Sequence, residues 1–128
     1  MVTKQLSVFI ENRQGRLGEV LNVLKNNGVN IQSLSLADTA EYGVLRLIVD
    51  KPEEGREKLF EAGFSALLTN VLIIKVPHTP GGLQDVLMSI SNSGISVEYM
   101  YGLTIAGDEA LIVVKTSDLK KACEVFGV

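Results

Sequence analysis

Residues 12–17 carry the most chemically distinctive spacing in this chain. Asn12, Arg13 and Arg16 surround Gly15, and the apolar spacing that begins at Leu17 predicts the start of a helix. A helix N-terminus offers unpaired backbone N–H groups and a partial positive charge, and both attract anions. Because Gly15 has no side chain, a ligand could approach the backbone closely. This segment therefore predicts a site that could bind a carboxylate.

Asn30 is a second residue with binding chemistry, because its amide has both a donor and an acceptor. It stands at the start of a predicted strand and could meet an ammonium group through its oxygen and a carboxylate through its nitrogen. Structural explanations stand beside these. Gly15 could only satisfy turn geometry, and Asn30 could only cap the start of the strand. Arg13 and Arg16 could be solvated loop charges.

The pattern recurs with an offset of 66 residues, which indicates an internal repeat. Residues 15–31 align with residues 81–97, including the helical stripes and the glycines that follow them. The identities are Gly15, Leu17, Val20, Leu21, Asn26 and Gly28. The repeat predicts two copies of one module, residues 1–70 and 71–128.

The alignment also extends into the later part of each copy. The offset of 66 places Leu45 over Leu111 and Leu47 over Val113, and it becomes 64 where Gly63 meets Gly127. A two-residue deletion in a connection explains this shift.

Each copy has the pattern strand, helix, strand, strand, helix, strand. Leu17, Val20, Leu21 and Leu24 form one apolar helical stripe, and alternating or β-branched runs predict the strands. The expected strands of copy one are 6–10, 31–37, 42–49 and 64–70, with a hairpin turn at 38–43 and a second helix at 52–62. In copy two the strands are 71–76, 95–105 and 110–115, with a turn at 106–109 and a helix at 118–126. The expected N-caps of these second helices are Asp50 and Ser117 or Thr116.

This element order predicts an α+β fold of two ferredoxin-like modules, each an antiparallel sheet with two helices on one face. A module of about 64 residues buries only about 60% of its unfolded surface, so we expect the copies to pair closely. Copy two stops at Val128, where a fourth strand should begin. We expect its last strand to be missing through truncation, with a three-stranded sheet as the alternative.

Composition excludes several classes of protein. The chain has 128 residues, a net charge of −3, one Cys and one His. This excludes an intrachain disulfide framework and a Cys-based zinc site, and the charge favours neither nucleic acid nor an anionic membrane. The longest apolar run, residues 110–114, is far below the roughly twenty that a spanning helix needs. We expect a soluble, cytoplasmic, non-catalytic protein without a metal or cofactor.

Two stretches in the first copy and one in the second resemble a known family. Residues 6–17, together with Gly28-Val29-Asn30-Ile31, resemble the ACT domain, and especially the small regulatory subunit of acetohydroxyacid synthase. Copy two has the family's fuller Pro-Gly-x-Leu form at Pro80-Gly81-Gly82-Leu83, whereas Gln14 replaces the usual proline in copy one. The resemblance covers essentially the whole chain as a tandem pair.

The resemblance implies a sensor or regulatory protein that binds a free amino acid near this loop and the start of the second strand, at an interface between two modules. It implies ligand contacts at Asn12, Arg13, Gly15, Leu17, Asn30 and Ile31, and at His78, Gly81, Gly82, Leu83, Ser96 and Val97. We expect a homodimer or a partnership with a biosynthetic enzyme subunit. The alternative is a ligand-independent regulatory or interaction subunit of such an enzyme.

Several further residues have a structural interpretation, and for some of them a binding role is the alternative. His78 could contact the effector and make the site pH-sensitive, or be a surface histidine. Leu83, like Leu17, is expected to be a core residue first. Cys123 lies on the inner side of a helical pattern, which predicts core packing. Tyr99 and Tyr101 share one face of a strand and could line a pocket or an interface, and we favour the interface.

Overall fold

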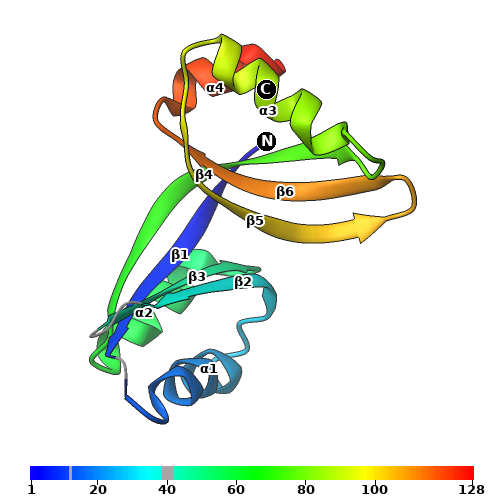
Figure 1. Ribbon diagram of the computed structural model, residues 1–128. Coiled ribbons are helices and arrows are strands. Elements are labelled where there is room, and N and C mark those ends of the chain that lie inside the picture. The colour runs from blue at the N-terminus through cyan, green and yellow to red at the C-terminus, as the bar shows by residue number, and fades with distance from the viewer. Residues whose placement is uncertain (12, 39–41) are drawn as a thin grey trace. The chain divides into compact units, whose positions relative to one another are not determined.

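The chain forms four helices and six strands in the part that the computed structural model describes, residues 1–11, 13–38 and 42–128 (Figure 1). These elements divide into two compact units. The first unit is Lys4–Thr69, and the second unit comprises Met1–Thr3 and Asn70–Val128. The boundary lies inside two strands, because β1 (Val2–Glu11) and β4 (Ser65–Pro77) each contribute residues to both units.

The first unit is a four-stranded sheet with two helices. Its other elements are α1 (Arg16–Asn26), β2 (Ile31–Asp38), β3 (Tyr42–Val49) and α2 (Pro52–Glu61). The strands lie in the order β2-β3-β1-β4, and β3 pairs antiparallel with both β1 and β2. This arrangement confirms the predicted ferredoxin-like order of elements.

The core of the first unit joins the helices to one face of the sheet. Val20 and Leu24 of α1 and Leu59 of α2 are fully buried among alternate residues of β1 and β3. Leu17 is partly buried and packs against this cluster, as the helical stripe predicts. At the surface, a hydrogen bond from Lys4 holds the pKa of the Glu53 carboxyl below its ordinary value.

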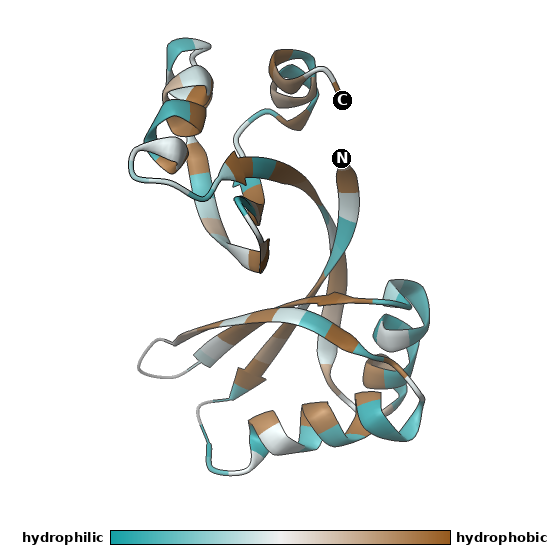
Figure 2. Cartoon of the chain, turned by 90° about the vertical axis from the view of Figure 1, so that its right-hand side faces the viewer, coloured by the Kyte–Doolittle hydropathy of each residue, from teal (hydrophilic) through white to brown (hydrophobic). Residues whose placement is uncertain are grey.

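The second unit repeats the architecture. It contains α3 (Gly82–Asn92), β5 (Val97–Ala106), β6 (Glu109–Thr116) and α4 (Leu119–Phe126). The strands lie in the order β1-β4-β6-β5, and β6 pairs antiparallel with β4 and β5. Figure 2 shows hydrophobic and hydrophilic residues interspersed along the helices, as expected of helices with one buried face. Ile90 of α3 and Ala122 of α4 are buried in the core of this unit.

The first residues of the chain lie beside β4 in the second unit, on the side away from β6. The Met1 ammonium group donates to the Ile73 carbonyl at 3.1 Å, and the Ile73 N–H donates to the Met1 carbonyl at 2.8 Å. In the first unit, the early residues of β4 lie beside β1, on the side away from β3. Each unit therefore has a fourth strand, and in the second unit the N-terminal segment supplies it.

A chain that lacks Met1, Val2 and Thr3 is expected to lose about 1–3 kcal/mol of stability in the second unit, because two backbone hydrogen bonds are removed at about 0.5–1.5 kcal/mol each. Such a chain can be released from a cleavable fusion. Hydrogen exchange should show faster exchange of the Ile73 amide, while the amide of Leu45 in β3 keeps its protection. Unchanged protection at Ile73 would contradict the described pairing.

The N-caps predicted for the second helix in each copy are wrong, because in both copies a predicted cap side chain accepts a hydrogen bond from the start of a strand instead. Lys51 is the N-cap residue of α2 and has no side-chain hydrogen bond, and Asp118 caps α4 through the Lys121 N–H. Asp50 Oδ1 instead accepts from the Asn30 N–H at 2.8 Å. Likewise, Ser117 Oγ accepts from the Ser96 N–H at 3.0 Å. These side chains hold the start of the second strand in each unit.

The predicted offset of the third strand is wrong by one residue. Leu45 pairs with Val8 in β1, and Ile112 pairs with Ile74 in β4, so Leu45 matches Ile112 rather than Leu111. In the same way Leu47 matches Val114 rather than Val113. The extra residue comes from a shift of register in β5 between Gly102 and Thr104. The hairpin turn predicted at 38–43 falls partly on residues 39–41, outside the described residues.

The deletion predicted in a connection lies in the second helix and its C-terminal turn, and it comprises three residues rather than two, because the offset falls from 67 at the N-caps Lys51 and Asp118 to 64 at Gly63 and Gly127 (67 − 64 = 3). Helix α2 has 10 residues and α4 has 8. The predicted strands 64–70 and 71–76 are one continuous strand, β4.

Candidate functional site

Gly15 and Gly81, the residues directly before α1 and α3, have the same backbone conformation. Gly15 and Gly81 are the N-cap residues, with φ of 88° and 85°, a left-handed conformation that glycine adopts without strain. Neither helix receives a side-chain cap hydrogen bond from the described residues. The first N–H groups, those of Arg16 and Gly82, donate to the carbonyls of Arg13 and Thr79 at 3.2 and 3.0 Å. An anion would therefore meet the N–H groups of the next residues, Leu17 and Leu83 among them.

The two arginines of the first loop differ in their surroundings. Arg16 stacks on Phe64, with 4.3 Å from its guanidinium carbon to the ring centroid, and it pairs with Glu19. These contacts give Arg16 a structural role within the first unit. Arg13 is exposed, and its backbone N–H donates to the Glu11 carbonyl. Asn12 lies outside the described residues.

Gly82 is constrained by packing. A Cβ at this position would lie 2.2 Å from the Pro77 carbonyl oxygen, far inside van der Waals contact. At Gly81 a Cβ would meet no atom within 4 Å, so only its backbone angle requires glycine. The two adjacent glycines thus shape the loop for different reasons.

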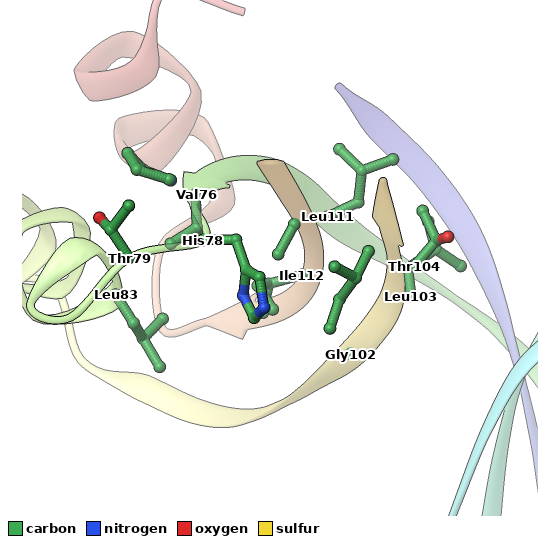
Figure 3. A pocket seen from close by; sticks show the side chains of 12 residues that line it. Val76, His78, Thr79, Leu83, Gly102, Leu103, Thr104, Leu111 and Ile112 are labelled. Atoms are coloured by element: carbon green, nitrogen blue, oxygen red, sulfur yellow. The ribbon is translucent and has the colours of Figure 1, made fainter. Parts of the chain in front are cut away.

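A cavity of about 480 Å³ adjoins the second loop, wholly within the second unit (Figure 3). His78 and Thr79 of the loop and Leu83 of the first turn of α3 form one side of it. The remaining wall comes from the ends of three strands: Val76, Pro77, Gly102, Leu103, Thr104, Ile105, Ala110, Leu111 and Ile112. Its size falls within the range of about 300–1,000 Å³ that is usual for small-molecule sites.

The starts of β2 and β5 lie elsewhere. Asn30 and Ile31 line a separate cavity of about 400 Å³ in the first unit, together with Leu21, Lys25, Gly28 and Val29. In the second unit Val97 pairs with Thr116 at the far end of β6, whereas His78 donates its backbone N–H to Asp108 at the near end. Ser96 is held at the same far end by Ser117.

The predicted site residues therefore fall into two groups within each unit. In the first unit the loop group is Arg13, Gly15 and Leu17, and the strand-start group is Asn30 and Ile31. In the second unit the loop group is His78, Gly81, Gly82 and Leu83, and the strand-start group is Ser96 and Val97. From Val97 to Leu103 the strand rises roughly 20 Å, at about 3.3 Å per residue. One amino acid cannot contact both groups of the same unit.

Sequence reasoning missed the strand residues of the cavity wall. Gly102, Leu103 and Thr104 come near the loop only through the pairing of β5 with β6. One signal was present in the repeat, where the offset of 66 places Gly102 under Leu36. A large apolar residue in one copy against glycine in the other marks a place where space opens.

Three other predictions can be placed in the structure. His78 is exposed and lines the cavity. Cys123 is a free thiol, partly buried against the core of the second unit as predicted. Tyr99 and Tyr101 are partly buried, and they pair with Lys115 and Val113 on the sheet face opposite the core.

Two classes of feature are not found in the described ranges. No group of His, Cys, Asp and Glu side chains there could hold a metal ion. No helix there is long and apolar enough to cross a membrane. A further cavity of about 500 Å³ lies between Met1 and the C-terminal residues Phe126 and Val128, over β4 and β6.

Comparison with known proteins adds a family match. A family model described as an ACT domain pair matches residues 1–127. The comparison with curated proteins gave no match.

Solved structures share the architecture. A protein from Bacteroides thetaiotaomicron is 38% identical, with a TM-score of 0.93 over 99% of this chain and 88% of that chain. The ligand-free regulatory subunit of aspartate kinase from Thermus thermophilus is 15% identical, with a TM-score of 0.68 over 99% of this chain and 95% of that one. The regulatory subunit of aspartate kinase from Thermus flavus is 13% identical, with a TM-score of 0.64 over 98% and 95%.

Proposed function

Since this chain belongs to the family of ACT domain pairs, we propose that it is a non-catalytic sensor that binds a free amino acid and regulates an enzyme of amino-acid biosynthesis. The aspartate kinase relatives are regulatory subunits by name. Regulation here means binding that favours one assembly over another, by the difference in the effector's affinity for the two.

The observation that carries this proposal is the cavity of about 480 Å³ beside the start of α3. Leu83 belongs both to the cavity wall and to the first turn of the helix. A carboxylate at the N–H groups without a side-chain cap would therefore stand next to an open apolar space for a side chain. This combination of anion site and apolar cavity suits an α-amino acid.

The separation of the two residue groups supports binding between two copies of the chain. An effector held by the loop group of one copy would reach the strand-start group only from another module, because the two groups of one unit are roughly 20 Å apart. We propose a homodimer in which Asn30 or Ser96 of one copy completes a site at the loop of the other. Asn12, which lies outside the described residues, belongs to the proposed loop group.

A thermal melting screen of all twenty amino acids is the direct test. At a concentration one hundred times its Kd, the effector should stabilise the chain by about 2.7 kcal/mol. One amino acid, or a few of related chemistry, should raise the Tm, while the others leave it unchanged. A screen in which none of the twenty raises the Tm would contradict the sensor.

Variants localise the binding. Asn30→Ala should reduce the ligand-induced rise in Tm if the strand start contributes, while Asn26→Ala at the exposed end of α1 serves as the matched control. The Asn30 backbone contact with Asp50 is kept in this variant, so the fold should be preserved. Sedimentation with and without the effector measures the change in assembly.

One observation favours the second candidate, a ligand-independent interaction subunit. Leu34 and Leu36 lie on β2, which pairs only with β3, and they are 49% and 47% exposed. An exposed edge strand with apolar side chains is a common protein-binding surface. Recovery of a biosynthetic enzyme subunit in a pull-down, together with an empty melting screen, would favour this candidate.

A further inference from the structure

The two units differ at one position on their edge strands. Leu36 of β2 faces Leu45, and Gly102 of β5 faces Ile112. Because Leu45 and Ile112 occupy the same place in their units, opposite β1 and β4 respectively, Leu36 and Gly102 are equivalent. Both face the same side of the sheet as the core residues.

In the first unit the side chain of Leu36 occupies this place. A Cβ built on Gly43 would lie 3.5 Å from Leu36 Cδ1 and 3.4 Å from Ile10 Cγ1. The isobutyl group of Leu36 therefore lies over Gly43, next to Ile10, at the end of the sheet that carries the loop.

In the second unit the same place is open. The counterparts of Ile10 and Gly43 are Val76 and Ala110, which are paired with each other, and both line the cavity together with Gly102. A Cβ built on Gly102 would meet no atom within 4 Å. The leucine side chain that fills this space in the first unit has no equivalent in the second.

A local irregularity of β5 is a second difference between the two units. The ladder of β2 runs without a shift from Leu36 to Asp38, whereas β5 has one extra residue, Leu103, between Gly102 and Thr104. Such bulges redirect side chains and are common beside binding sites. Leu103 and Thr104 both line the cavity.

The residues that line the cavity determine which kind of side chain can bind there. The residues that line the space include Leu83, Leu103, Ile105, Leu111 and Ile112, all aliphatic. Figure 3 labels four of these residues, Leu83, Leu103, Leu111 and Ile112, among those that line the cavity. A charged or strongly polar side chain would lose part of its hydration here without a matching set of partners. An aliphatic side chain loses no polar hydration and gains apolar contacts.

We propose that this cavity accepts the side chain of a branched aliphatic amino acid (leucine, isoleucine or valine), which takes the place that Leu36 has in the first unit. The second unit is then the unit whose loop binds the effector, because in the first unit the half-exposed side chain of Leu36 already lies at that place. This inference rests on the proposed function and specifies its ligand class and its location.

Isothermal titration of the whole chain with leucine, isoleucine and valine tests the ligand class, with serine, aspartate, lysine and histidine as comparisons. The expected result is binding of the aliphatic amino acids with one site per chain. Binding of a polar amino acid alone would overturn this inference and leave the proposed function standing. Absence of binding by the three aliphatic amino acids would overturn this inference, and a melting screen in which none of the twenty raises the Tm would overturn the proposed function as well.

Gly102→Leu tests the location, because it rebuilds in the second unit the side chain that Leu36 supplies in the first. It should weaken leucine binding at least tenfold without lowering the Tm of the unliganded chain. Leu36→Ala, the matched control in the first unit, should change the affinity less than twofold. Unchanged affinity in Gly102→Leu would overturn the inference.

A graded variant and a direct contact measurement keep this test independent of folding. Gly102→Ala should weaken leucine binding by an intermediate factor. In the unaltered chain, NOEs should join the methyl groups of bound leucine to those of Leu83 and Ile112. NOEs to residues of the first unit only would place the ligand elsewhere and overturn the inference.

Discussion

Leu24→Ala is expected to remove about 2–5 kcal/mol from the free energy of unfolding of the first unit. Leu24 is 0% exposed. A Cβ built on Gly55 of α2 would lie 3.4 Å from Leu24 Cδ2 and 3.3 Å from Leu6 Cδ2, so α1, α2 and β1 meet at this point. Truncation leaves a cavity where three elements pack together, and their close approach limits collapse around it.

Urea unfolding followed by circular dichroism measures this loss, and hydrogen exchange assigns it to a unit. Leu34→Ala is the control, because Leu34 is about half exposed and its truncation should cost far less. Ile90→Ala, at the equivalent position of α3, should produce a comparable loss in the second unit, since Ile90 is 1% exposed. A loss below about 1 kcal/mol for Leu24→Ala would contradict the packing described here.

Gly82→Ala is expected to destabilise the second unit by about 3 kcal/mol or more, since overpacking commonly costs 1–3 kcal/mol and here the obstacle is backbone. The new Cβ would lie 2.2 Å from the Pro77 oxygen. Either the start of α3 or the end of β4 must move. Both border the cavity, so ligand binding should be lost together with stability.

Gly81→Ala is the matched comparison for Gly82→Ala. Its Cβ would meet nothing within 4 Å, and only the left-handed backbone is strained, at about 1–2 kcal/mol. Thermal unfolding should therefore rank Gly82→Ala below Gly81→Ala. The hydrogen bond from the His78 N–H to Asp108 gives a local readout by hydrogen exchange. Equal stability of the two variants would contradict this account of the loop.

The order of elements could be predicted because local signals determined it. The stripe of Leu17, Val20 and Leu24 repeats with helical spacing, and the structure places all three against the core. Alternation in strands is equally local. The fold class followed from these signals and from the repeat, whereas the family was indicated by the resemblance of residues 6–17, 28–31 and 80–83 to the ACT domain.

The caps and the cavity wall could not be predicted, because they depend on contacts between distant residues. Asp50 has the chemistry of a cap, yet the Asn30 N–H, 20 residues away, takes its carboxylate. The bulge at Leu103 is invisible in composition, since it arises from pairing with β6. The cavity depends on that pairing, and no local pattern describes it.

The pairing of Met1 with Ile73 has a consequence for how the protein is made. The two residues are 72 positions apart, and at about 5–20 residues per second a ribosome needs roughly 4–14 s to add that length. The first three residues must therefore wait for their partner strand while the rest of β1 can already pair within the first unit. Synthesis order favours the first unit as the earlier one to fold, and the pairing of Met1 with Ile73 then has to close a chain segment of 72 positions.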